Sequence, residues 1–241
     1  MQTYDNATKV VHDQTKQLMS LAAGISNIGQ TPVGDVIAME KFPKCATCDE
    51  EDAAILALLE RMADQKQAFW SKTGIPPEKW PGPTLLLALP SIETRVPRVW
   101  SVAMDGERFA HTEILEDPGV WLEGSPNDVF ALLYGFHPVV SEGLKAGLGV
   151  SDQQFREALV KMKVLRPVER LNLMTMPLQD AIDLAVFLAS VQIEMDRFLP
   201  GTPVCGHPID VMVLRMVPTP EILTYPGKSL HHPLSRGTLH P

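Results

Sequence analysis

Two cysteines, Cys45 and Cys48, have a spacing that can support chemistry. A Cys-x-x-Cys pair ahead of a helix is typical of a redox dithiol, whose thiolate the helix dipole stabilises, or of half a zinc site. Four acidic residues at 49–52 follow the pair, and their negative charge raises a thiol pKa. The nearest further zinc ligands, His231 and His232, lie in a tail that the sequence does not position. The sequence therefore favours a plain loop pair, with a metal or redox site as the lesser alternatives and no cofactor expected.

The composition limits the classes of protein that the chain can belong to. It has 241 residues, of which 45% are hydrophobic and 21% charged, enough to bury a full core in one domain. The net charge of −8 argues against a nucleic-acid partner. No signal-peptide pattern opens the chain, and no apolar run approaches the roughly 20 residues that span a bilayer. We expect a cytoplasmic protein without a membrane partner, whose three cysteines stay reduced.

The cysteine pair lies between two expected helices, in a chain whose strands and helices come in blocks. Residues 8–11 and 17–23 are expected to form a hairpin, which a glycine turn and a helix over 31–42 follow. Asp49 is placed to cap a second helix that reaches about residue 73. Later strands are expected at 84–89, 98–104, 108–113 and 120–123, and helical segments at 128–134 and 137–176, clearest at 151–164.

The clearest single element is a helix over residues 177–199. Pro177 lies where the first turn begins, and Asp180 and Asp183 favour the positive end of the helix dipole. Its apolar residues form two stripes, so two faces of the helix require burial. One stripe is Ile182, Ala185, Ala189 and Ile193, and the other is Leu184, Leu188, Val191, Met195 and Phe198. A buried strand is expected at 209–214, and an irregular tail at 217–241.

This order predicts an α+β fold in which two stacked antiparallel sheets lie between two helical layers, a four-layer αββα sandwich. The order and several local sequences resemble the proteasome-like branch of the N-terminal-nucleophile (Ntn) hydrolases. The residues that carry the resemblance are 4–10 (Tyr-Asp-Asn-Ala-Thr-Lys-Val), 23–29 (Ala-Gly-Ile-Ser-Asn-Ile-Gly), Gly124-Ser125, and 178–185 with 208–211. The resemblance implies one domain over 1–216, with 137–176 as a helical insertion.

The resemblance also implies site residues. In the family an N-terminal residue, usually Thr, attacks an amide carbonyl, with its own amine as base. Lys9 matches the lysine that lowers the nucleophile's pKa, and Gly24 matches the glycine whose N–H stabilises the oxyanion. Ser125 is the counterpart of a serine that supports the amine, and Asp196 of an acidic residue near the end of the long helix. Lys9, Gly24 and Ser125 each have a simpler interpretation, as a solvated lysine, a turn glycine and a helix cap, and the loop after Asp196 is longer than in the family.

The nucleophile itself has no counterpart. In the family a strand pair that begins with the nucleophile precedes the matched lysine, whereas eight residues precede Lys9 here. We therefore expect a fold that is incomplete at its N-terminus. Two functions remain open: an amide or peptide hydrolase whose nucleophile segment is absent from this chain, or a non-catalytic assembly subunit. The second apolar stripe of helix 177–199 predicts a homo-oligomer in either case.

Overall fold

A computed structural model of the protein describes residues 10–13, 18–24, 27–28, 31–39, 42–104, 106–114, 120–122, 127–135, 137–161, 171–198, 209–216 and 219–228. The chain divides into two compact units. The first comprises Met1–Asp117 with Asp210–Tyr225, and the second comprises Pro118–Ile209 with Pro226–Pro241. Taken together, their elements are those of a mixed α+β protein.

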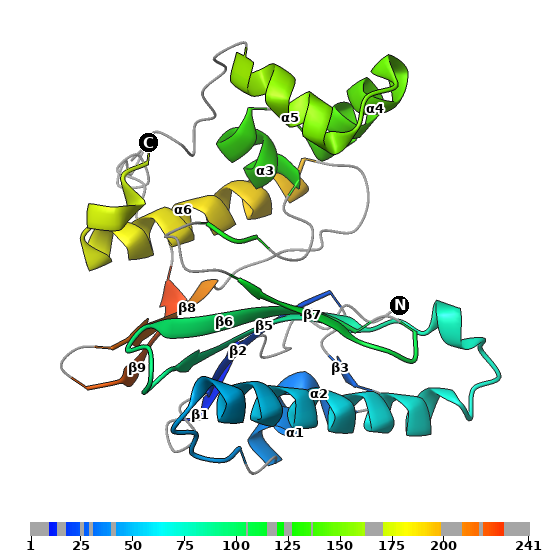
Figure 1. The fold of residues 1–241 in the computed structure, drawn as a ribbon, viewed down its shortest axis with the longest axis vertical. Helices are drawn as coiled ribbons and strands as arrows, with labels where there is room; N and C mark the ends of the chain where they lie inside the picture. The colour runs from blue at the N-terminus through cyan, green and yellow to red at the C-terminus, as the bar shows by residue number, and fades with distance from the viewer. Residues whose placement is uncertain are drawn as a thin grey trace, which may run out of the picture. The chain divides into compact units, whose positions relative to one another are not determined.

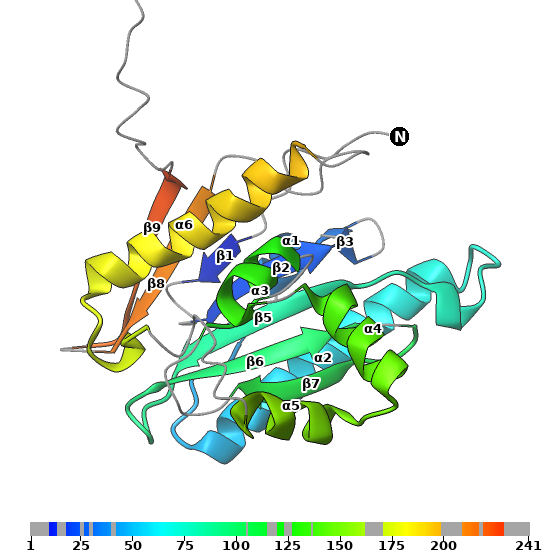
Figure 2. The ribbon, with the colours of Figure 1, turned by 90° about the horizontal axis from the view of Figure 1, so that it is seen from above.

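The first unit is built on a five-stranded antiparallel sheet with the order β1-β2-β5-β6-β7 (Figures 1 and 2). Its strands are β1 (Val10–Asp13), β2 (Leu18–Gly24), β5 (Pro83–Pro90), β6 (Pro97–Ala103) and β7 (Ala110–Ile114). Consecutive strands pair as neighbours, and β1 and β2 form the expected N-terminal hairpin. Two short strands, β3 (Asn27–Ile28) and β4 (Thr31–Pro32), pair separately.

Helices α1 (Val33–Met39) and α2 (Cys48–Trp70) cover one face of this sheet, and a short 3-10 turn, η1 (Pro77–Lys79), follows them (Figure 1). Alternate residues of β5 and β6 point towards the helices, and the register places Leu85 opposite Val102 and Leu87 opposite Trp100. These side chains pack with Ile55, Leu58, Leu59 and Met62 of α2 in the largest buried cluster. The apolar face of α2 and the alternate, inward-facing residues of the strands therefore form one core.

The opposite face of the same sheet is apolar but only partly buried. Met19, Leu86, Ala88 and Val99 are half-buried there, and Leu21 is exposed. The first unit also contains the paired strands β8 (Ile209–Arg215) and β9 (Glu221–Lys228). Residues 211–214 of β8 are apolar on both faces and are all half-buried.

The second unit is helical among the described residues. It contains α3 (Asn127–Tyr134), α4 (Pro138–Leu148), α5 (Asp152–Lys161), the 3-10 turn η3 (Leu173–Thr175) and α6 (Leu178–Asp196). Leu188 of α6 packs against Val129 and Leu133 of α3, with Leu184 and Val191 at the edge of this cluster. Ile182, Val186 and Ile193, on another face of α6, are buried as well. Both faces that the sequence predicts for burial thus contain buried residues.

Three local expectations were wrong. Thr47, not Asp49, caps α2, because its hydroxyl accepts a hydrogen bond from the Glu50 N–H at 3.3 Å. Residues 120–122 form no strand, and Val120 and Leu122 instead pack at the edge of the α3–α6 cluster. Residues Glu221–Lys228 of the expected irregular tail form β9, where Ile222 is buried. None of the helices in the described part of the chain combines the length and apolarity needed to cross a bilayer.

Candidate functional site

The residues expected from the resemblance are only partly within the described structure. Lys9 and Ser125 lie outside the described residues. Gly24 is the last residue of β2, opposite Pro83 of β5, so it does end a strand. Asp196 is the last residue of α6 and is buried. Gly24 belongs to the first unit and Asp196 to the second.

Asp196 belongs to a polar cluster within the second unit. The amide nitrogen of the buried Gln192 donates to Asp196 Oδ1 at 3.1 Å and to Asp128 Oδ2 at 3.3 Å. The amide oxygen of Gln192 accepts from the Asp128 backbone N–H at 3.3 Å. Asp128 lies in the first turn of α3, shortly after Ser125 in the sequence. The Gln192 side chain therefore joins the end of α6 to the start of α3, and its amide nitrogen donates hydrogen bonds to two carboxylates.

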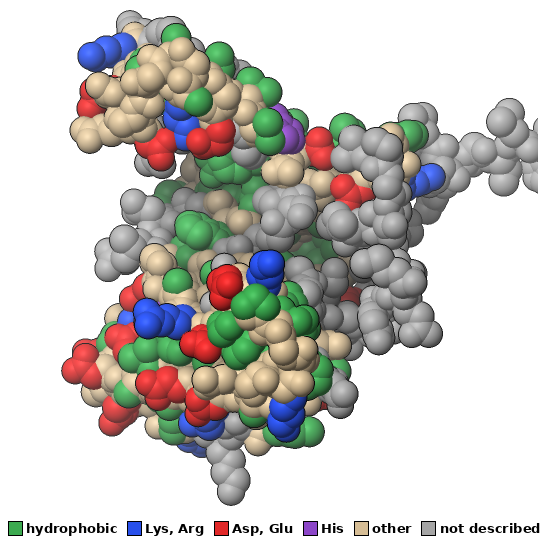
Figure 3. Space-filling model, turned by 90° about the vertical axis from the view of Figure 1, so that its right-hand side faces the viewer, with side chains coloured by type: hydrophobic (Ala, Val, Ile, Leu, Met, Phe, Trp, Pro, Cys, Tyr) green, Lys and Arg blue, Asp and Glu red, His purple; other side chains and the backbone are tan. Residues whose placement is uncertain are grey.

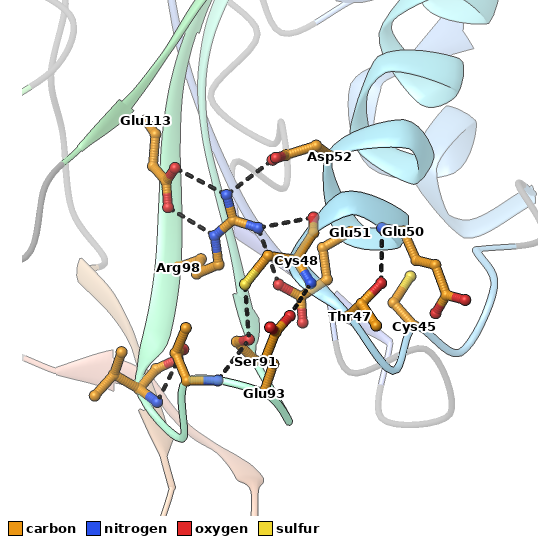
Figure 4. Close-up of polar contacts among 12 residues, drawn as sticks. Cys45, Thr47, Cys48, Glu50, Glu51, Asp52, Ser91, Glu93, Arg98 and Glu113 are labelled. Carbon is orange, nitrogen blue, oxygen red and sulfur yellow. Dashed lines mark hydrogen bonds and ion pairs between the residues drawn. The ribbon is translucent and has the colours of Figure 1, made fainter.

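A second polar cluster, which sequence reasoning missed, lies in the first unit and is centred on Arg98 of β6 (Figure 4). Arg98 is buried, and its guanidinium stacks on Trp100 with 4.8 Å between the central carbon and the ring centroid. Its Nε and Nη2 donate to the two oxygens of Glu113 at 2.7 and 2.8 Å. The remaining bonds run to α2, where Nη1 donates to the Cys48 carbonyl and to Glu51, and Nη2 donates to Asp52.

All five N–H groups of the Arg98 guanidinium are thus used, which is the full capacity of the side chain. We call Arg98, Glu51, Asp52 and Glu113 the Arg98 cluster. The hydrogen bonds that Arg98 donates to Glu113 raise the pKa of Arg98 above its usual value and lower the pKa of the Glu113 carboxyl. Glu51 is 1% exposed, and its Oε1 has no hydrogen-bond partner among the described residues. The cluster joins α2, β6 and β7 through groups distant in sequence.

Cys48 lies against this cluster at the start of α2 (Figure 4). Its N–H donates to Glu93 at 2.6 Å, and its sulfur lies 3.9 Å from the hydroxyl of Ser91, so it connects α2 to the loop between β5 and β6. The Cys45 thiol donates to the Pro43 carbonyl at 3.6 Å. The two thiols therefore have different partners.

The surroundings of both cysteines disfavour free thiolates. Burial raises the thiol pKa of Cys45, and the charges of Glu51 and Glu50 raise it further. Burial also raises the thiol pKa of Cys48, as does its hydrogen bond to Glu93, although Ser91 and Arg98 act in the opposite direction. Within the described ranges, no three His, Cys, Asp or Glu side chains converge as a metal site would require. The raised thiol pKa values fit the loop-pair interpretation better than a redox dithiol.

Comparisons with models of known protein families, with curated proteins and with solved structures find no match to this chain. The assignment of a function therefore depends on the resemblance and on the geometry described above.

Proposed function

We propose that the chain forms the framework of a proteasome-like Ntn fold and acts as an assembly subunit that associates with further copies of itself through helix α6. The observation that carries the proposal is the surface of α6. Two of its faces contain buried residues, yet Phe187 and Met195 on the helix, and Phe198 just after its end, remain 44%, 41% and 80% exposed. Phe187, Val191 and Met195 recur every four positions, which places them along one side of the helix.

The first unit supports the four-layer part of the proposal. Two helices cover one face of its antiparallel sheet, and the other face is apolar and half-buried, as a stacked second sheet requires. The β8–β9 pair belongs to the same unit and is apolar on both faces of β8, which is typical of a strand in an inner layer. In this proposal β8 and β9 belong to the second sheet.

The second unit also exposes several large apolar residues, and its described core is small. Large apolar residues are exposed on α4 as well as on α6: Val139, Val140, Leu144 and Leu148. Figure 3 shows hydrophobic side chains at the surface of the helical part that contains α4 and α5. Contiguous exposed apolar surface is typical of an interface with another chain.

The mass of the protein in solution tests the assembly proposal. We expect wild type to form an oligomer by size-exclusion chromatography with light scattering, and Phe187→Glu with Phe198→Glu to shift it to the monomer. The matched control is Ile92→Glu, because Ile92 is 60% exposed but lies in the first unit, and this variant should keep the oligomer. A monomeric wild type, or equal dissociation by Ile92→Glu, would contradict assembly through α6.

A second candidate function, amide hydrolysis, is favoured by the position of Asp196. This carboxylate is buried at the end of α6 and is tied through Gln192 to the start of α3, close in sequence to Ser125. Because this function needs a nucleophile segment, the test is to translate the DNA directly upstream of the Met1 codon in frame. A strand-like segment with Thr, Ser or Cys after a cleavable position would favour the hydrolase, and an early in-frame stop would favour the assembly subunit.

A further inference from the structure

The proposed function makes no use of β7, the last strand of the five-stranded sheet (Figures 1 and 2). One side of β7 pairs with β6, and no described strand pairs with its other side. Ala110, His111 and Thr112 are exposed, so this edge of the sheet is open to solvent. An open edge presents backbone N–H and C=O groups with which a further strand can pair.

The sequence of β7 lacks several features that commonly protect an edge strand. Lysine, proline and β-bulges are among these features. β7 contains neither lysine nor proline, and all five of its residues pair in register with residues of β6, without a bulge. Thr112 and Ile114 are β-branched, which favours an extended backbone. A partner strand can therefore join this edge.

The charge beside the edge limits the chemistry of that partner. Glu113 of β7 belongs to the Arg98 cluster, in which one guanidinium and three carboxylates give a formal net charge of −2. The side chains of Glu113 and Asp52 are 36% and 47% exposed, so part of this negative charge reaches the surface. Each Glu113 oxygen accepts one hydrogen bond from Arg98, although a carboxylate has about four acceptor positions. A partner strand should therefore place a donor opposite Glu113.

A second β7 strand places this donor correctly in one register. Two copies related by a two-fold axis can continue the sheet with their helices on the same side when the axis passes through a residue of β7. An axis through His111 sets two imidazoles opposite each other, and one through Glu113 sets two carboxylates opposite each other, which is destabilising. An axis through Thr112 pairs all five residues and sets His111 opposite Glu113 twice.

We propose that β7 pairs with β7 of a second copy, antiparallel and centred on Thr112, so that the two five-stranded sheets form one continuous sheet. On the side that carries α2, where Val102 and Trp100 lie opposite His111 and Glu113 in β6, each His111 imidazole N–H donates to Glu113 of the other copy. On the other side, Ala110 lies opposite Ile114, and the two Thr112 side chains face each other. Polar and apolar pairs of this kind stabilise antiparallel strands. The interface does not rest on the proposed association through α6.

The β7 contact is small, and its strength follows from its size. Stable protein interfaces bury about 1,200–2,000 Å² in total, and a single pair of five-residue strands buries much less. The contact is therefore weak and becomes populated as the protein concentration rises. A chromatography column dilutes the sample, so the Phe187→Glu, Phe198→Glu variant still elutes as a monomer.

Disulfide trapping tests the register, because it captures weak contacts. The full chain is used in the Phe187→Glu, Phe198→Glu background, with its three native cysteines replaced by serine, under mild oxidation at high protein concentration. Thr112→Cys should cross-link two copies at least about tenfold faster than Gln65→Cys, an exposed control on α2, because opposite Cβ atoms lie about 4.5–5.5 Å apart.

Two further cysteine variants fix the register by their behaviour as a mixture. Ala110→Cys and Ile114→Cys lie opposite each other only between copies that pair about Thr112. We expect a mixture of the two variants to give a cross-linked heterodimer, identified by its intact mass, and each variant alone to cross-link no faster than Gln65→Cys.

Charge substitutions at His111 test the pairing with Glu113. His111→Glu should slow cross-linking of Thr112→Cys about tenfold, because two pairs of carboxylates then face each other. His111→Lys should cross-link as fast as its parent, since an ammonium group also donates to Glu113. Gln65→Glu adds one negative charge elsewhere on the first unit and should have no effect.

Each of the other results would overturn the proposal. Cross-linking of Thr112→Cys no faster than the Gln65→Cys control would exclude a second copy as the partner of β7. Efficient cross-linking of Ala110→Cys alone would mean a different register, and equal losses with His111→Glu and His111→Lys would exclude the charge pairing.

Hydrogen exchange followed by NMR at low protein concentration tests whether the edge is open in the monomer. Alternate amides of β7 should exchange rapidly, and protection of all of them would mean that another segment of this chain covers the edge. Circular dichroism shows whether each variant folds. If Thr112→Cys unfolds, the mixture of Ala110→Cys and Ile114→Cys tests the same register.

Discussion

Arg98 is the residue on which most of the polar structure of the first unit depends. Replacing it with Met removes five hydrogen bonds and leaves Glu51 buried without a counterion. Breaking a buried ion pair by removing one partner costs about 3–5 kcal/mol. We predict that Arg98→Met lowers the free energy of unfolding by about this amount, measured by urea denaturation. The control, Arg197→Met, removes an exposed pair with Glu194 and should cost less than about 1 kcal/mol.

Glu113 makes this cluster sensitive to acid. Arg98 lowers the pKa of Glu113 in the folded protein relative to its usual value, so the folded state binds the proton less readily than the unfolded chain. The stabilisation by Glu113 is therefore complete above the unfolded pKa of about 4.3 and is lost as the pH falls through the lower folded pKa. We predict that Glu113→Gln flattens the fall in stability below about pH 5, measured by urea midpoints at several pH values. Parallel curves for variant and wild type would contradict this role.

The Arg98 cluster could not be found from the sequence, because Arg98 lies 15 residues from Glu113 and 46 and 47 residues from Asp52 and Glu51. A strand arginine among apolar residues has no local pattern that reveals whether it is buried. The cap of α2 shows a related limit. Thr47 and Asp49 are both residue types that cap helices, and both lie ahead of the apolar residues of α2, so only the backbone geometry shows that Thr47 is the cap. Cys45-x-x-Cys48, by contrast, was visible as a motif together with the acidic residues at 49–52, and the structure added Glu93 as a further acidic neighbour.

At the scale of elements, long periodic patterns were predicted well and isolated segments were not. Helix α6 was evident because two apolar stripes repeat over its whole length, and α2 for the same reason. The hairpin of β1 and β2, and the run β5 to β7, followed from alternation and turn residues. The strand expected at 120–123 was wrong for the described residues 120–122, because their three apolar or aromatic side chains fit a strand or a packed loop equally well. β8 was expected as a buried strand, and its described residues are mostly half-buried.

The contact between α3 and α6 yields a prediction at the same scale. Gln192→Leu leaves the Asp128 N–H and the buried Asp196 carboxylate without the amide that joins them. A buried polar group left without its partner costs about 1–3 kcal/mol, so the variant should be destabilised by about this amount. Gln179→Leu on the same helix is the control, because it removes an exposed hydrogen bond to Asp183 and should change stability by less than about 0.5 kcal/mol. If both substitutions destabilised the protein equally in thermal unfolding, the proposed role of Gln192 in joining α3 to α6 would be contradicted.

At the scale of the whole molecule, the two units differ in how their elements are buried. β5 and β6 alternate buried residues along most of their length and contact α2 in a continuous core. In α4 and α5 no described side chain is buried, and the pair of helices is connected by Lys145, which contacts both Glu142 and Asp152. An exposed salt bridge contributes little, so these helices depend on their own hydrogen bonds and on few apolar contacts.

Hydrogen exchange should reveal this difference directly. Amides in β5, β6 and the buried part of α2 are expected to exchange only when the first unit unfolds as a whole. Amides in α4 and α5 are expected to exchange through local opening, with protection lower by at least about 100-fold. Exchange under native conditions, followed by mass spectrometry of peptides, measures both classes in one sample. Comparable protection in α5 and β6 would mean that contacts outside the described residues, or with another copy, cover the helices. Repeating the measurement on the Phe187→Glu, Phe198→Glu variant separates these cases, because only coverage by another copy through α6 would be lost.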